Sequence, residues 1–154
     1  YWPFSLSNLF VKFISSVFAV ITILLFVSNS RAEVNSLHIS SRLDPNAIII
    51  TQVDVVFVYT QKLVDEFPAT KTDWYSSQRQ FIAEAGTDID LVSIFIPQGF
   101  DSETASLPTR RNEALKVFVF AQHDDSIAPP IDITELGNVL VEIDAFGILV
   151  SSRT

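Results

Sequence analysis

The residues that could bind a metal ion or take part in catalysis are few, and the densest group is His123, Asp124 and Asp125. An imidazole nitrogen and two carboxylates in one loop are donors that a divalent cation can use. No second ligand cluster is recognisable elsewhere in the sequence. We therefore interpret this group as a solvated acidic turn, and a metal-dependent hydrolase built around it is the alternative.

Other catalytic patterns are missing from the sequence. There is no Gly-x-Ser-x-Gly motif, and four glycines are too few for a phosphate-binding loop. The absence of cysteine excludes a disulfide scaffold and a thiolate metal site. Pairs of acids such as Asp65 and Glu66 occur at the spacings expected in any acidic domain. The sequence thus predicts a protein that is not an enzyme and that has no cofactor or bound metal.

Charge excludes some partners. The formal net charge of the chain is -8, from 10 basic and 18 acidic residues. Lys12 and Arg31 precede the main domain, so residues 33–154 carry 8 basic residues against 18 acidic ones, or -10. Such a domain repels nucleic acids and anionic lipids. The one basic pair, Arg110 and Arg111, is either part of a solvated loop or a contact for the carboxylates of a partner.

An apolar segment precedes the acidic domain. Residues 13–30 are uncharged and follow Lys12, and Ser30 and Ala32 are small residues at the spacing of a signal-peptidase site. We therefore predict an exported protein whose residues 1–32 are a signal peptide, cut after Ala32, or an uncleaved hydrophobic membrane helix. A buried core helix is a third reading. The single domain is then expected over residues 33–154.

Stretches rich in β-branched and aromatic residues predict strands in this domain. The strongest is 48–60, where Val53 and Val55 alternate with Asp54 and Val56. Such alternation places one set of side chains in a core and the other on a partly covered face. The other expected strands are 37–40, 90–96 and 115–122, with two or three more over 131–133 and 139–150.

One helix is expected between the second and third strands. Thr72 and Asp73 can cap a helix from Trp74 to Ala85, and Gly86 can end it. Trp74 lies on its apolar stripe, so we expect a core residue, although an interface anchor is an alternative. One helix among five to seven short strands predicts a mainly β protein, an antiparallel β-sandwich with one inserted helix.

The order of these motifs resembles the TssJ-type lipoproteins of type VI secretion systems. The motifs that carry the resemblance are residues 37–41, the turn Asp44-Pro45-Asn46, residues 53–59 followed by Leu63 and Phe67, the turn Pro97-Gln98-Gly99, and residues 117–121. Together they cover roughly residues 37–123. The resemblance implies a transthyretin-like β-sandwich at the outer membrane that binds the periplasmic part of the inner-membrane protein TssM. The family is lipidated on a cysteine, whereas this chain has Ala32 and Glu33 at that place, so a lipid tether is not implied.

We therefore expect a non-enzymatic accessory protein, located in the periplasm or associated with the cell envelope, in a type VI-like secretion apparatus. Its expected partner is another envelope protein, with the periplasmic domain of a TssM-like protein as the candidate. The loops expected to contact this partner contain Asp44, Pro45, Asn46, Pro97, Gln98, Gly99, Arg110 and Arg111. The alternatives are a secreted metal-dependent hydrolase and a small-molecule-binding β-sandwich module.

Overall fold

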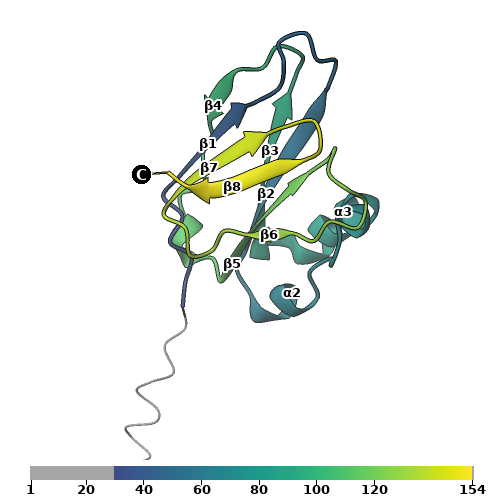
Figure 1. The fold of residues 1–154 in the computed structure, drawn as a ribbon. Helices are drawn as coiled ribbons and strands as arrows, with labels where there is room; N and C mark the ends of the chain where they lie inside the picture. Colours follow the sequence, from purple (N-terminus) through teal and green to yellow (C-terminus); the bar gives the residue numbers. More distant parts are fainter. Residues whose placement is uncertain (1–29, 154) are drawn as a thin grey trace, which may run out of the picture. The chain divides into compact units, whose positions relative to one another are not determined.

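The computed structural model describes residues 30–153, which form two four-stranded sheets with helices beside one of them (Figure 1). The predicted leader lies almost entirely outside the described residues, so its helix and its cleavage stay predictions. Within residues 30–153, no helix is long and apolar enough to cross a membrane.

The two sheets confirm the predicted mainly β fold. The first sheet has the order β4-β1-β7-β8 and the second the order β3-β2-β5-β6. The strands of the first are β1 (Ser36–Ser41), β4 (Ser102–Thr104), β7 (Asn138–Ile143) and β8 (Ile148–Ser152). Those of the second are β2 (Thr51–Val58), β3 (Ile89–Ile96), β5 (Lys116–Ala121) and β6 (Ile131–Asp132).

One strand pair differs from the predicted antiparallel arrangement. β1 and β7 run parallel, with Leu37 opposite Val139 and Ile39 opposite Val141. A parallel pair needs a long crossover connection. Here the connection from β1 to β7 passes through the whole second sheet, which sequence periodicity does not reveal.

Alternating side chains of both sheets form the core of the sandwich. Val53, Val55 and Phe57 of β2 point into this core, as their spacing predicts, and all three are fully buried. The other fully buried contributors are Leu37, Ile39, Val117, Val119, Val139, Val141 and Ile143. The period-2 pattern of the sequence therefore assigned the inward faces of the central strands correctly.

The helices differ from the prediction in number and in starting point. α3 (Lys71–Ala85) begins three residues earlier than expected, because the hydroxyl of Thr70, and not Thr72 or Asp73, accepts the capping hydrogen bond from the backbone of Asp73. A short additional helix, α2 (Gln61–Asp65), is capped in the same way by Thr60. Two 3-10 turns, η1 (Gly86–Asp88) and η2 (Arg111–Glu113), complete the list.

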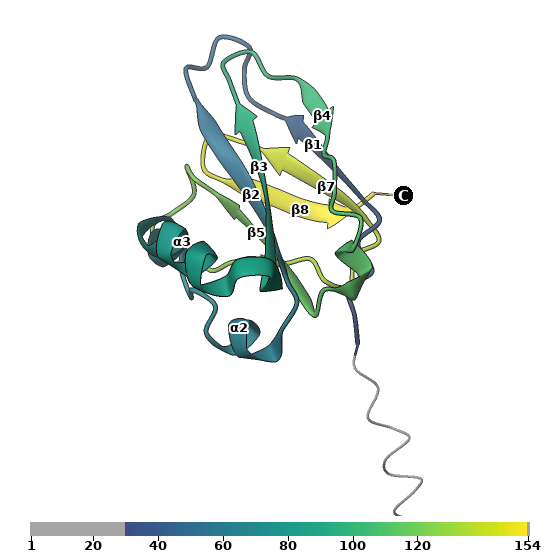
Figure 2. The same ribbon diagram turned by 180° about the vertical axis from the view of Figure 1, so that it is seen from behind.

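Helix α3 covers the outer face of the second sheet through aromatic packing (Figure 2). Trp74 is fully buried, and its ring stacks on Phe120 with centroids 5.4 Å apart. Phe67, from the segment between α2 and α3, stacks on Phe118 at 4.3 Å. The prediction that Trp74 is a core residue is thus confirmed, and β2 and β5 are covered on both faces.

A buried carboxylate lies between α3 and the sheet. Asp54 is fully buried in β2, and its Oδ2 accepts hydrogen bonds from Trp74 Nε1 at 3.1 Å and Gln78 Nε2 at 3.3 Å, both on α3. Its Oδ1 accepts from Gln52 Nε2 at 2.8 Å and from Ser93 Oγ at 2.7 Å. All four partners donate, which suits a group that can only accept. These bonds fix the position of α3 along the sheet.

The aromatic layer makes a prediction that two phenylalanines can test. Phe120 is 2% exposed and stacks on Trp74, whereas Phe95, on β3 of the same sheet, is 61% exposed. We expect Phe120→Ala to lower the free energy of unfolding by about 3–5 kcal/mol, because it removes a buried ring and leaves a cavity. Phe95→Ala should cost less than about 1 kcal/mol. Urea titration followed by circular dichroism measures both, and equal losses would contradict the packing described.

Candidate protein-interaction site

Four connections meet at one end of the sandwich, which we call the loop end. They are residues 42–50, 97–101, 122–130 and the β7–β8 turn 144–147. Backbone hydrogen bonds tie them together, from Ser41 N to Asp101 O, from Arg42 N to Ile143 O, and from Gln122 N to Gln52 O. The chain enters the domain at the opposite end, where residues 32–35 precede β1 (Figure 1).

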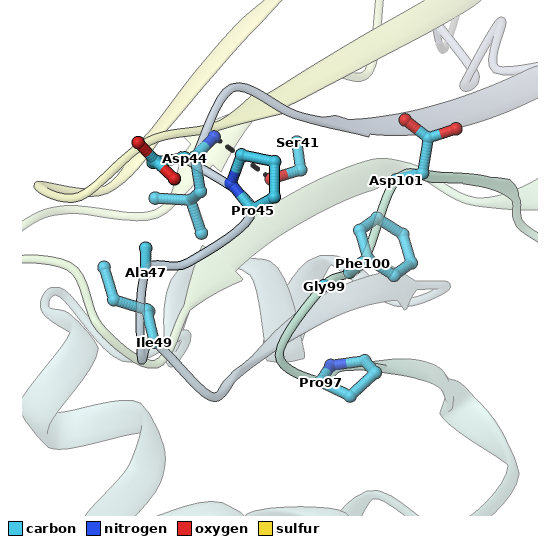
Figure 3. Close-up of a pocket in the computed structure, with 10 residues that line it drawn as sticks. Ser41, Asp44, Pro45, Ala47, Ile49, Pro97, Gly99, Phe100 and Asp101 are labelled. Carbon is cyan, nitrogen blue, oxygen red and sulfur yellow. Dashed lines mark hydrogen bonds between the residues drawn. The ribbon is translucent and has the colours of Figure 1, made fainter.

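The loop end brings together two of the turns that the sequence singled out. Asp44 and Pro45 from one loop and Pro97 and Gly99 from the other line a shared hollow of about 200 Å³ (Figure 3). Asn46 and Gln98 lie in the same two turns. The hollow is open and is smaller than the ~300 Å³ at which ligand pockets usually start, so it does not favour a small-molecule site.

Local chemistry fixes the shape of both turns. The carboxylate of Asp44 accepts a hydrogen bond from Asn46 N at 2.8 Å, and Asp44 O accepts one from Ala47 N at 2.8 Å. The second turn closes with Phe100 N donating to Pro97 O at 3.2 Å. Gly99 lies at its third position with φ of 78°, a conformation that favours glycine. Both predicted turns are therefore confirmed.

His123 connects three parts of the loop end. Its Nε2 lies 2.9 Å from the carbonyl oxygen of Asp144 and 3.1 Å from that of Gly147, so this nitrogen must carry a proton. Its Nδ1 lies 2.9 Å from Thr51 Oγ1. The imidazole thus links the start of β2, the 122–130 loop and the β7–β8 turn. Both ring nitrogens are engaged within the protein.

The positions of His123 and Asp124 do not favour the alternative of a metal site at this loop. The ring of His123 makes no bond to the side chain of Asp124, whose carboxylate instead lies against Gly147. A Cβ at Gly147 would collide with that carboxylate, so a larger residue there would displace the Asp124 side chain. Within residues 30–153, no group of three or more His, Asp or Glu side chains is arranged to hold a metal ion.

Large apolar side chains are exposed at the loop end. Six of them are exposed within the described residues, and every one lies in a loop of this end or within two residues of one. They are Ile48 (82%), Ile50 (62%), Phe95 (61%), Ile127 (75%), Phe146 (87%) and Leu149 (52%). Because single exposed apolar residues are usual but a gathering at one end is not, this distribution makes the loop end the candidate interaction surface.

Sequence reasoning missed these side chains. Residues 48–60 were expected to be one strand, but β2 begins only at Thr51, and Ile48 and Ile50 belong to the loop. The available signal was the run of three isoleucines that begins one residue after the Asp44-Pro45-Asn46 turn. Phe146 lies two residues after Asp144 in the β7–β8 turn. The carboxylate of Asp144 accepts hydrogen bonds from Phe146 N and Gly147 N, and these bonds close the turn.

Acidic residues surround the exposed apolar side chains. The four loops contain five aspartates, and Arg42 is their only lysine or arginine. The aspartates are Asp44, Asp101, Asp124, Asp125 and Asp144. Arg42 is itself paired with Glu142, with Nε and Oε2 3.4 Å apart. One further cation lies at this end, because Lys71 Nζ of α3 donates to the carbonyl oxygens of Gln122 at 3.0 Å and Asp124 at 2.7 Å. The loop end is therefore apolar at its tips, with more acidic than basic groups between them.

Arg110 and Arg111 lie at the opposite end, away from the other six residues expected to contact a partner. They precede β5, and Leu115 N donates to Val58 O at the end of β2. Arg110 Nε donates to Asp90 Oδ2 at 3.0 Å, and its guanidinium lies over the ring of Tyr59, 3.8 Å from the centroid. The guanidinium of Arg110 therefore already interacts with Asp90 and Tyr59 of the same domain. The structure does not join this pair to the loop end.

Solved structures of type VI secretion components have a similar fold. The T6SS lipoprotein TssJ1 from Pseudomonas aeruginosa superposes with a TM-score of 0.53 at 10% identity, over 78% of this chain and 97% of that one. A chain of the structure described as the T6SS protein TssM C-terminal domain from EAEC gives 0.50 at 14% identity, over 75% and 98%. Serratia marcescens Lip, described as a membrane bound component of the type VI secretion system, gives 0.47 at 11%, over 77% and 98%.

The likeness to TssJ1, at a TM-score of 0.53, confirms the predicted TssJ-like β-sandwich. No protein-family profile matches the sequence, and no curated protein sequence matches it either. At identities this low, the likeness concerns the fold.

The hydrogen bonds that Asp90 accepts from Tyr59 and Arg110 predict how stability depends on pH in the acid range. Burial raises the pKa of the Asp90 carboxyl, but hydrogen bonds from Arg110 and Tyr59 outweigh burial and hold the pKa below its ordinary value of 3.8. The Asp90 carboxyl therefore binds a proton more readily in the unfolded chain than in the folded one. The stabilisation is present above the ordinary pKa and is lost as the pH falls through the lower folded-state value.

We expect Asp90→Asn to lower the free energy of unfolding at neutral pH by a small amount, because Arg110 and Asp90 are 37% and 32% exposed and solvent screens the pair. The difference between wild type and variant should shrink as the pH falls below 3.8. Urea titrations at several pH values measure it, with Asp65→Asn on the exposed surface of α2 as the control. A difference that is constant from neutral to acidic pH would contradict the assignment.

Proposed function

We propose that this protein is a non-enzymatic accessory protein of the cell envelope that binds another envelope protein through its loop end. The observation that carries the proposal is the gathering of exposed apolar side chains at that end. Side chains such as Phe146 and Ile48, more than four-fifths exposed, would contribute favourable burial free energy if a partner covered them.

The construction of the loop end supports binding to a protein. Hydrogen bonds through His123 and Asp44 hold the loops in defined conformations before any partner arrives. A preorganised surface loses less conformational entropy on binding than a flexible one, so more of the interaction energy remains as affinity. An open surface of this kind suits a protein better than a small molecule.

Charge defines the partner further. The aspartates between the apolar tips outnumber the nearby cations Arg42 and Lys71, and Arg42 is already paired with Glu142, so the field at this end is negative. A complementary partner has apolar residues at its centre and lysine or arginine at its rim. The acidic character of the loop end argues against the surface of an anionic membrane as the binding partner.

The fold supports a place in secretion. The T6SS lipoprotein TssJ1 from Pseudomonas aeruginosa has a similar fold. We infer that this protein acts in a type VI-like apparatus, in the periplasm or at the envelope, and that its partner is the periplasmic domain of a TssM-like inner-membrane protein. The TssJ-like motifs at Asp44-Pro45-Asn46 and Pro97-Gln98-Gly99 lie on the same loop end.

A pair of double variants tests this proposal. We expect Ile48→Ser with Phe146→Ser to weaken binding to the periplasmic domain of the TssM-like protein of the same organism at least tenfold, since each removes an exposed anchor worth about 1 kcal/mol or more. The control is Lys62→Ser with Glu66→Ser, two exposed residues in and after α2 at the opposite end. Biolayer interferometry measures both affinities.

Two results would count against the proposal. Equal affinities of the two double variants would exclude the loop end as the binding surface. No measurable binding by the wild-type protein would exclude this partner. Circular dichroism of both variants checks that they are folded, and because Ile48 and Phe146 are exposed, we expect unchanged spectra.

A further inference from the structure

The segment that precedes β1 is built into the folded domain. Ala32 N donates to Ala114 O at 2.8 Å, Glu33 N donates to Thr134 O at 2.8 Å, and Asn35 N donates to Gly137 O at 2.7 Å. Residues 32–35 therefore form hydrogen bonds with two separate parts of the chain. They are not a linker between a leader and a domain.

Burial shows where this integrated segment starts. Ala32 is 5% exposed and Val34 is 0% exposed, and both belong to the core between the sheets. Ser30 and Arg31 are exposed, and the compact unit of the chain begins at Arg31. The change from exposed to buried thus falls between Arg31 and Ala32.

The burial of Ala32 argues against the predicted cleavage after this residue. A cut there would remove a core residue and would leave the carbonyl of Ala114, a fully buried residue, without its donor. The sequence holds a second position with the same small-residue spacing, because Ser28 and Ser30 stand two residues apart directly upstream. A cut after Ser30 leaves every buried residue of the domain in place.

We propose that the leader is cleaved after Ser30, so that the mature protein begins at Arg31 and keeps Ala32 as part of its core. This goes beyond the proposed function, because it concerns processing and does not depend on which partner the loop end binds. The exposed Arg31 accommodates the new charged terminus, whereas Ala32 is needed for packing and for the bond to Ala114.

Intact-mass spectrometry tests the proposal directly. The full chain, with an initiator methionine added, is expressed in a Gram-negative host and recovered from the envelope and periplasmic fractions. We expect a mass that corresponds to a start at Arg31. A start at Glu33, or a chain that retains the leader, would overturn the proposal.

Two substitutions separate the two cleavage positions without relying on the folded product. Ser28→Arg places a large charged residue three positions before the proposed cut but five before the alternative one. Ala32→Arg alters the last residue before the alternative cut, and it lies beyond the proposed one. Because the peptidase requires small residues near its cut, we expect Ser28→Arg to accumulate as precursor and Ala32→Arg to be processed normally in a short radioactive pulse. Normal processing of Ser28→Arg together with accumulation of the Ala32→Arg precursor would overturn the proposal. The pulse is short, so processing is measured before a misfolded product can be degraded.

Discussion

The arrangement of the second sheet depends on the burial of one carboxylate. Asp54 lies in the middle of β2 with no exposed surface, and an isolated carboxylate in such a place would cost several kcal/mol. No lysine or arginine contacts it among the described residues; four neutral donors surround it instead. Two of these donors are on α3, so the helix can cover the sheet in only one register. Burial of Tyr75 on the same helix, beside Asp54, raises the pKa of its phenol and keeps it neutral.

This constraint also explains where the molecule is left uncovered. With α3 fixed over Phe120 and Phe118, the outer face of the sheet is covered from β5 across the lower part of β2. The first residues of β2 and the last of β3 extend past the helix, where Phe95 is exposed. The other exposed apolar side chains lie in the loop before β2, in the loop after β5, and in or beside the β7–β8 turn. The covered half supplies stability, and the uncovered half is the surface that we assign to binding.

The two ends of the sandwich therefore differ in construction. The end at which the chain enters contains the buried Ala32 and Val34, the ion pair of Arg110 with Asp90, and the capped helix α2. The loop end contains the shared hollow, the His123 contacts and the acidic rim. The fold is similar to that of Pseudomonas aeruginosa TssJ1 although only 10% of the residues are identical.

The sequence alone determined the local features of this protein. The faces of β2, the burial of Trp74, the two proline turns and the class of fold followed from periodicity and turn chemistry, which act between residues close in the chain. Only the tertiary structure decided which distant segments meet. It joined the Asp44 turn to the Pro97 turn, separated both from Arg110 and Arg111, paired β1 with β7 in parallel, and placed Ala32 in the core. These contacts join residues far apart in sequence, and their free energy comes from burial and hydrogen bonds that exist only once both sheets have formed, so no local pattern encodes them.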